Sequence, residues 1–295
     1  MASGSPENRA TTEAELREAA TRGEPTPISV AGWLRLSLRV FLLVAALVVL
    51  VPLHYLYRLF AYGSPFPKLF LRFATAVCGA KVERIGVPLR RDVFFIANHV
   101  SWIDILALAG ASGTAFVAKA ELGEVPVVGW LSRLNRTVFV KRENRLGVAE
   151  QINSLREALA DNWSVAVFPE GTVTDGHSLL PFKTSMLTVL DPPPPGVYVQ
   201  PVMLHYGAIA EWIGWVGDES GLNNAKRVLA HKGRFTLQVH FLEPFSPGEF
   251  RGRKAIGTEA RRRIEEALVA ALGKPLRDYR YSVDPVRYKP PTPVE

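Results

Sequence analysis

The sequence lacks several features on which common catalytic and binding sites depend. Cys78 is the only cysteine among the 295 residues, so an intramolecular disulfide and a cysteine-based zinc site are both excluded. It has no G-x-S-x-G pattern to place a serine nucleophile and no G-x-x-x-x-G-K-S/T loop to hold nucleotide phosphates. The histidines other than His99 are scattered without the spacing of metal ligands. We therefore expect neither a metal nor a cofactor, and a serine hydrolase is disfavoured.

Charged side chains are also scarce, at 21% of the residues, whereas hydrophobic residues make up 48%. Such an excess of apolar residues points to a membrane. The net charge of +7 suits nucleic acid, anionic lipid headgroups or a phosphorylated substrate equally well. Basic residues gather from Arg251 to Lys254 and from Arg261 to Arg263. They favour a rival function, that of a nucleic-acid or lipid-surface binding protein. The other interpretations of these residues are a carrier-docking patch and the solvated face of a helix. Because no aromatic-rich RNA motif accompanies them, we expect no nucleic-acid partner.

Residues 1–28 are polar, with almost no large apolar side chain before Ile28. A segment of this composition cannot bury enough surface to offset the entropy lost on ordering. We expect a disordered tail over residues 1–28, with at most a transient helix from Glu13 to Arg22.

The longest apolar run follows this tail. Fourteen uncharged residues run from Val40 to Leu53, and the apolar character continues to Tyr57. A membrane-spanning helix needs about 20 such residues, so the run nearly reaches that length. A buried core helix is the alternative. A cleaved signal peptide is disfavoured, because no small-residue cleavage site follows the run.

An amphipathic stretch lies directly after the apolar run. Residues Phe66 to Val77 mix large apolar side chains with Lys68 and Arg72, a pattern typical of a helix in a bilayer interface. We expect residues 29–80 to form a membrane-associated helical segment, which either crosses the membrane once or enters it as a hairpin. The single cysteine fits an active face in the cytosol, on the inner or plasma membrane.

Residues 81–295 have the pattern of one α/β domain, in which short β-branched runs alternate with segments of helical period. Strands are expected at Val93–Ala97, Thr114–Ala118, Thr137–Val140, Val165–Phe168, Val197–Leu204 and Phe235–Leu242. Helices are expected near Trp102–Ala109, Leu146–Asp161, Phe182–Leu190 and Lys254–Leu272. This alternation favours a mostly parallel sheet flanked by helices.

The most informative stretch runs from Asn98 to Asp104, between an expected strand and the helix after it. Active sites of α/β folds lie at the carboxyl ends of strands. His99 and Asp104 are spaced so that the carboxylate can hold one ring nitrogen while the other faces a substrate hydroxyl, as a general base requires. Asp104 also fits a helix-capping role together with Ser101. Both roles are compatible.

Two further stretches place polar residues at strand ends. Phe168 to Thr172 brings Glu170 and Gly171 after an apolar strand, where a carboxylate accepts hydrogen bonds and glycine lets a backbone amide approach a ligand. Thr137 to Val140 is followed by Lys141 and Arg142, cations able to bind a phosphate. Taken singly, each of these stretches also fits an ordinary strand end.

Together the stretches resemble the lysophospholipid and glycerol-phosphate acyltransferase family, over roughly residues 80–245. The family's motifs appear in order over about 100 residues, as Asn98, His99 and Asp104, then Phe139 and Arg142, then Phe168 to Thr172, then Pro201 and Val202. The resemblance implies an acyltransferase in which His99 takes the proton of the acceptor hydroxyl, Asp104 orients the imidazole, and the oxygen attacks an acyl thioester without an acyl-enzyme. Acyl carrier protein or coenzyme A would carry the acyl group.

The resemblance also implies a lysolipid acceptor and the residues that bind it. They are Asn98, Arg142, Glu170, Gly171, Thr172 and Lys183. Many family members have arginine directly after the Glu-Gly-Thr, where this chain has Val173, and Lys183 is the nearest replacement by sequence. The breadth of the family favours 1-acylglycerol-3-phosphate, giving phosphatidic acid in phospholipid biosynthesis. The Asp175-Gly176 pair, with Trp215 to Asp218 downstream, looks instead like the branch that acylates lyso-ornithine lipids.

Overall fold

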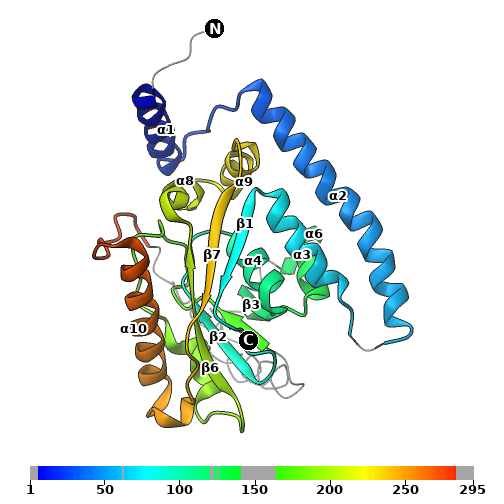
Figure 1. Ribbon diagram of the computed structural model, residues 1–295, viewed down its shortest axis with the longest axis vertical. Coiled ribbons are helices and arrows are strands. Elements are labelled where there is room, and N and C mark those ends of the chain that lie inside the picture. The colour runs from blue at the N-terminus through cyan, green and yellow to red at the C-terminus, as the bar shows by residue number, and fades with distance from the viewer. Residues whose placement is uncertain (1–5, 62, 120–122, 125, 141–163, 284–295) are drawn as a thin grey trace, which may run out of the picture.

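The computed structural model describes residues 6–61, 63–119, 123–124, 126–140 and 164–283 (Figure 1). Within these ranges a seven-stranded sheet has the order β1-β7-β6-β2-β5-β3-β4. Its strands are β1 (Ala80–Ile85), β2 (Val93–Ala97), β3 (Ala115–Lys119), β4 (Val138–Val140), β5 (Ser164–Val167), β6 (Tyr198–His205) and β7 (Phe235–Phe241). All neighbouring pairs are parallel except β6 and β7. The predicted α/β fold with a mostly parallel sheet is confirmed.

Helices cover both faces of the sheet. They are α1 (Pro6–Thr21), α2 (Val30–Arg58), α3 (Phe66–Val77), α4 (Ile103–Ser112), α6 (Pro126–Leu134), α8 (Ala210–Ile213), α9 (Gly221–Ala230) and α10 (Gly252–Leu272), with short 3-10 helices η1 (Thr184–Leu190), η2 (Gly207–Ile209) and η3 (Pro247–Glu249). The central strand β2 is fully buried and divides the core. Its Phe95 packs in the cluster that contains α4, and its Phe94 packs in the cluster that contains α10. Successive side chains of β2 therefore pack against the helices on opposite faces of the sheet.

The predicted strands agree with the observed ones to within one residue at each end. The helix expected near Phe182–Leu190 is the 3-10 helix η1, and the helix expected at Leu146–Asp161 lies outside the described residues. Strand β1 was not predicted, because as an edge strand it buries little beyond Ala80 and carries Lys81, Glu83 and Arg84. Such a strand shows no apolar run to recognise.

Helix α2 is longer than the apolar run alone predicted. Its first turn is capped by Ser29, whose hydroxyl accepts the backbone N–H of Gly32, and the helix continues through Pro52 to Arg58. By length and composition it can cross a membrane. Large apolar side chains such as Val48 (67% exposed) and Phe41 (66% exposed) cover its outer surface. Helix α3 packs against both α2 and α4, so it lies between the apolar helix α2 and helix α4 (Figure 1).

The structure differs from the expected disorder of residues 1–28. Helix α1 occupies Pro6–Thr21, and its Ala20 is fully buried. Arg17 is buried too, and donates to the Gly214 carbonyl at 2.9 Å and to a Glu219 carboxylate oxygen at 3.5 Å. The composition argument counted only apolar side chains, whereas a buried arginine with distant partners anchors this helix.

Candidate active site

Three parallel strands bring polar side chains together at one edge of the sheet. β2 pairs with both β5 and β6 in parallel, so the carboxyl ends of all three strands lie side by side. His99 follows β2, Glu170 follows β5 and Tyr206 follows β6. This is the edge at which α/β folds hold their active sites.

His99 and Asp104 form a close pair at this edge. Nδ1 of His99 lies 2.8 Å from Oδ2 of Asp104. Since an ionised carboxylate only accepts hydrogen bonds, Nδ1 carries the proton and Nε2 keeps a lone pair. The Asp104 side chain is fully buried, while that of His99 is 16% exposed. Nε2 is therefore the ring nitrogen available to a substrate, which is the orientation that a general base needs.

Asp104 is itself held by several donors. Its Oδ2 accepts the backbone N–H groups of Val100 at 2.6 Å and Ser101 at 2.9 Å, and its Oδ1 accepts the hydroxyl of Tyr206 at 2.5 Å. Asp104 thus orients the ring and also accepts N–H groups just before α4, but the cap of this helix is Trp102 rather than the expected Ser101, and Trp102 makes no side-chain capping bond. Burial, together with the Asp104 charge, raises the pKa of Tyr206 well above its usual value, so Tyr206 stays a hydrogen-bond donor.

The imidazole ring is also fixed from its flat face. The His99 ring stacks on Phe168, with centroids 4.0 Å apart and planes 13° from parallel. The His99 carbonyl accepts two bonds from Thr174, from its N–H at 2.7 Å and its hydroxyl at 3.1 Å. Thr174 and Tyr206 are functional positions that the sequence analysis missed, because only the fold brings them to His99.

Asn98 and Glu170, expected to bind the acceptor, bond instead to backbone groups. The Asn98 amide donates to the Leu204 carbonyl at 3.0 Å and accepts the Leu204 N–H at 2.7 Å, which ties β2 to β6. Glu170 accepts the N–H of His99 at 2.7 Å and that of Leu180 at 2.9 Å. Both side chains are 1% exposed. Each side chain therefore helps to fix the backbone of the turn that contains His99.

Burial outweighs these hydrogen bonds in setting the charge of Glu170. It raises the pKa of this carboxyl to about 8, against the opposing effect of the two backbone donors. Glu170 is therefore mostly protonated at neutral pH, and the active edge carries one negative charge fewer than its carboxyl count implies.

Gly171 and Lys183 meet at the turn after β5, in which Thr172 follows Gly171. Gly171 has φ +75°, and a Cβ at this position would lie 2.9 Å from Nζ of Lys183. The Lys183 N–H donates to the Pro169 carbonyl at 2.8 Å, which fixes the start of its side chain at the same turn. A side chain at residue 171 would thus displace the lysine ammonium. Arg142, the other expected cation, lies outside the described residues.

Asp175 and Asp218, the acidic residues of the two stretches that resemble the lyso-ornithine branch, both make contacts within the protein. Asp175 is 2% exposed and is paired with Arg277 at 2.9 Å. Although burial opposes ionisation, the His177 N–H and the Arg277 guanidinium lower the pKa of Asp175. This carboxylate is thus engaged within the protein. Asp218 is exposed, and its N–H donates to the Thr21 carbonyl at 2.8 Å, beside the end of α1.

An apolar cavity of about 400 Å³ opens next to the His99 turn. Helices α2, α3, α4 and α6 form its walls, and Leu50, Phe70, Trp102, Ile105, Phe116 and Leu131 are among its lining residues. Phe116 stacks on Phe168, whose ring also stacks on the imidazole of His99. The cavity thus extends from α2, the helix long enough to cross a membrane, toward His99.

Comparison with known proteins agrees with this geometry. The family model described as Acyltransferase matches residues 81–205. A lyso-ornithine lipid O-acyltransferase from Rhizobium meliloti (strain 1021) is 33% identical over 257 residues, which cover 80% of this chain and 86% of that protein. A 1-acyl-sn-glycerol-3-phosphate acyltransferase from Neisseria gonorrhoeae is 28% identical over 207 residues, 66% of this chain and 74% of that protein. The solved 1-acyl-sn-glycerophosphate (LPA) acyltransferase from Thermotoga maritima shares the fold, with a TM-score of 0.58, 23% identity, and coverage of 81% of this chain and 95% of that one.

Proposed function

The chain belongs to the acyltransferase family, and we propose that it is a lysolipid O-acyltransferase with His99 as its general base and a lyso-ornithine lipid as its acceptor. The observation that carries the chemistry is the His99–Asp104 pair, with a 2.8 Å contact at Nδ1 and Nε2 left for the substrate. We derive the steps and the acceptor separately.

In the first step Nε2 of His99 takes the proton of the acceptor hydroxyl while that oxygen attacks the thioester carbonyl carbon. The buried Asp104 carboxylate offsets the positive charge that forms on the imidazole. In the second step the carbon–sulfur bond breaks, and the departing thiolate takes the proton back from Nε2. The products are the acylated lipid and the free thiol of acyl carrier protein or coenzyme A, and His99 returns to its starting state.

The apolar cavity suits the fatty acyl chain of the thioester. It has an apolar lining, its Phe116 stacks on Phe168, which in turn stacks on His99, and α2 forms part of its wall. Leu106 lines the cavity from α4. Leu106→Trp fills part of this space, so we expect the preferred acyl chain to become shorter in a competition between thioesters of different length. Leu222→Trp, at a site 67% exposed on α9, should leave the preference unchanged.

Two findings support the lyso-ornithine acceptor over the phosphate acceptor that the breadth of the family favours. The lyso-ornithine relative is more similar, at 33% identity over 80% of the chain against 28% over 66%. The turn after β5 also carries Val173 where many family members have arginine. An ornithine headgroup has one carboxylate and no phosphate, so it needs fewer cationic ligands. We assign two cations to the carboxylate of the ornithine headgroup. They are Lys183, whose ammonium group lies beside Gly171, and Arg142.

Lysophosphatidate is the second candidate acceptor. It is favoured by the Neisseria relative, and Lys183 beside the Glu-Gly-Thr turn can equally bind a phosphate. Both acceptors place the reacting hydroxyl at His99. We further propose that the active face is cytoplasmic, where soluble acyl thioesters are available.

A direct comparison of the two acceptors tests the assignment. The purified full-length protein is incubated with one radiolabelled acyl thioester and either lyso-ornithine lipid or lysophosphatidate, and the extracted lipids are separated. We expect at least about tenfold faster transfer to lyso-ornithine lipid, a ratio that matched polar recognition readily supplies. Transfer to lysophosphatidate alone would overturn the acceptor and leave the acyltransferase activity intact.

A further inference from the structure

Helix α3 borders a second cavity, of about 560 Å³, which shares no lining residue with the apolar one. On this helix, residues 66, 67, 70 and 71 line the apolar cavity, whereas residues 68, 72, 75 and 76 line the second. Positions four residues apart lie on the same side of a helix. The two cavities therefore face different sides of α3, and β1 and the second half of α4 complete the walls of the second one.

The charged side chains around this second cavity are all cationic. We call it the basic groove and define it by Lys68 and Arg72 of α3, Lys81 and Arg84 of β1, and Arg234 just before β7. None of its lining residues is acidic. Lys81 is paired with the neighbouring Glu83 at 3.1 Å. Within the described part of the chain, the other four cations have no ion pair.

These cations stand close enough to affect one another. Burial, with the charges of Arg72 and Arg84, lowers the pKa of Lys68. Like charges gathered around a cavity repel, and an anion between them removes that repulsion. A volume of this size lies in the range of small-ligand sites. The groove therefore has the charge and the space for an anionic group.

The surroundings of the groove distinguish a lipid from other anions. Leu69 and Phe73 on the outer side of α3 are 50% and 38% exposed, and Val87, just after β1, is 81% exposed. Helix α2, which is long enough to cross a membrane, packs against α3. Exposed apolar side chains beside cations match the bilayer interface, where phosphates lie next to acyl chains.

We propose that the basic groove binds the phosphate headgroup of an anionic phospholipid, at a site separate from His99. Ala107 and Ala111 line the groove from α4. At 1.5 Å per residue they lie about 6 and 12 Å along the helix from Ile103, its first residue, beside the His99 turn. The bound lipid holds α3 at the membrane surface, with the apolar cavity on the other side of this helix. It is neither acceptor nor product of the reaction.

Binding of a short-chain phosphatidylglycerol to the detergent-purified full-length protein, measured by native mass spectrometry, tests the groove. Arg72→Gln with Arg84→Gln should weaken binding about thirtyfold, because each basic residue near an anionic lipid contributes a factor of about five. Both side chains are exposed, so the fold should survive. Arg72→Lys with Arg84→Lys keeps the charges and should bind within a few-fold of the wild type.

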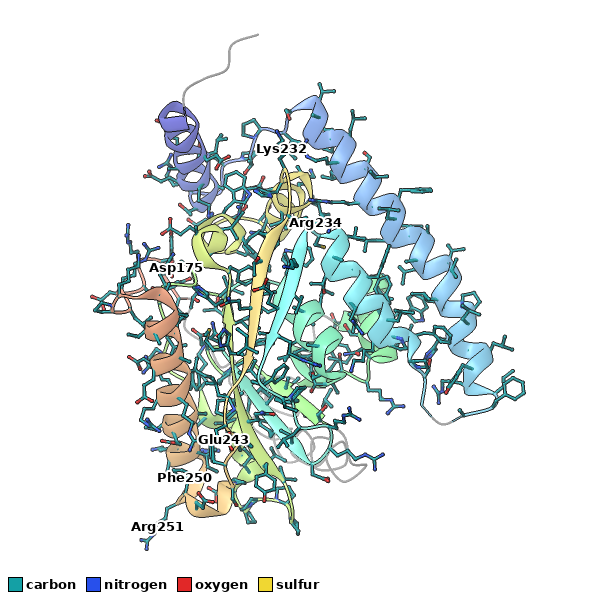
Figure 2. All side chains as sticks on the ribbon, in the orientation of Figure 1. Asp175, Lys232, Arg234, Glu243, Phe250 and Arg251 are labelled. Atoms are coloured by element: carbon teal, nitrogen blue, oxygen red, sulfur yellow. The ribbon has the colours of Figure 1, made fainter. Side chains whose placement is uncertain are left out.

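A matched control removes two charges elsewhere. Arg251 and Lys254 are exposed near the start of α10, and Figure 2 shows Arg251 at the opposite end of the molecule from Arg234. Arg251→Gln with Lys254→Gln should leave phosphatidylglycerol binding unchanged. If the control variant lost phosphatidylglycerol binding as strongly as the groove variant, the basic groove would not be the binding site. If inorganic phosphate bound as tightly as the lipid, the groove would not be specific for a lipid. Weakened binding of acyl carrier protein, with lipid binding intact in the groove variant, would assign the groove to a protein partner instead.

Discussion

At the scale of single residues, two buried acidic side chains, Asp104 and Glu170, support His99 in different ways. Asp104 contacts the imidazole itself, whereas Glu170 accepts the backbone N–H of His99. The sequence predicted the first contact because the two residues are five apart. It assigned Glu170 to the substrate because its partner Leu180 and the closing of the turn are visible only in the fold. The bonds of Asn98 to Leu204 could not be predicted for the same reason, since Leu204 lies 106 residues away.

The buried carboxyl of Glu170 should make stability depend on pH. Its pKa in the folded protein, about 8, lies above the ordinary value of 4.5. The stabilisation from its bound proton is therefore fully present below about pH 4.5 and is lost as the pH rises through about 8. Glu170→Gln cannot titrate, and it leaves one backbone donor facing an amide N–H₂, which should cost about 1–3 kcal/mol.

Thermal unfolding in detergent at pH 5 and pH 8.5 measures this effect. The wild type should be more stable than Glu170→Gln at pH 5, and the difference should shrink at pH 8.5. Glu266→Gln, at an exposed site on α10, should show no such change. A difference that is independent of pH would mean that Glu170 is ionised throughout.

At the scale of elements, local pattern was enough for the buried strands and for α10, but not for α1, β1 or α9. The buried strands are apolar runs of strand length, so they can be predicted from their own residues alone. Helix α1 depends on a distant cluster. Arg17 and Arg227 both donate to Glu219, and Arg227 also donates to the Gly214 and Trp212 carbonyls. No composition rule detects an element whose anchor is about 200 residues away.

Removing the anchor should release α1 without unfolding the domain. Arg17→Ala deletes charge-assisted hydrogen bonds worth about 1.5–3 kcal/mol, so the released state should become about tenfold or more populated. Limited proteolysis with proteinase K should then cut the segment before α2 faster. Arg22→Ala is the matched control, because the Arg22 side chain is 57% exposed and, among the described residues, forms ion pairs with the nearby Glu18 and Glu24 alone. Equal cleavage of both variants would show that Arg17 does not anchor the helix.

At the scale of the whole molecule, α2 and α3 add an apolar wall to an otherwise ordinary α/β domain (Figure 1). The sequence predicted this division from the apolar run and the amphipathic stretch after it. It did not predict that the two helices would enclose a cavity beside the catalytic turn, because Trp102, Phe116 and Leu131 join its lining from three separate elements. The same arrangement creates the basic groove on another side of α3.

Helix α2 should keep the protein on membranes mainly through apolar contact. Full-length protein should therefore sediment with membranes and stay in the pellet after a wash at high salt, which screens charge but not apolar burial. Detergent should release it. Recovery of the protein in the high-speed supernatant without detergent would contradict a membrane role for α2.

The central claim is that His99 activates the hydroxyl of a lysolipid for attack on an acyl thioester. Transfer of a radiolabelled acyl group to lyso-ornithine lipid by wild type, His99→Ala and Asp104→Asn, each first checked for wild-type thermal unfolding, tests it most directly. Loss of the base should slow transfer by about 10²- to 10⁴-fold, and Asp104→Asn should be nearly as damaging because the ring loses its orientation. Transfer by His99→Ala at the wild-type rate would contradict the account.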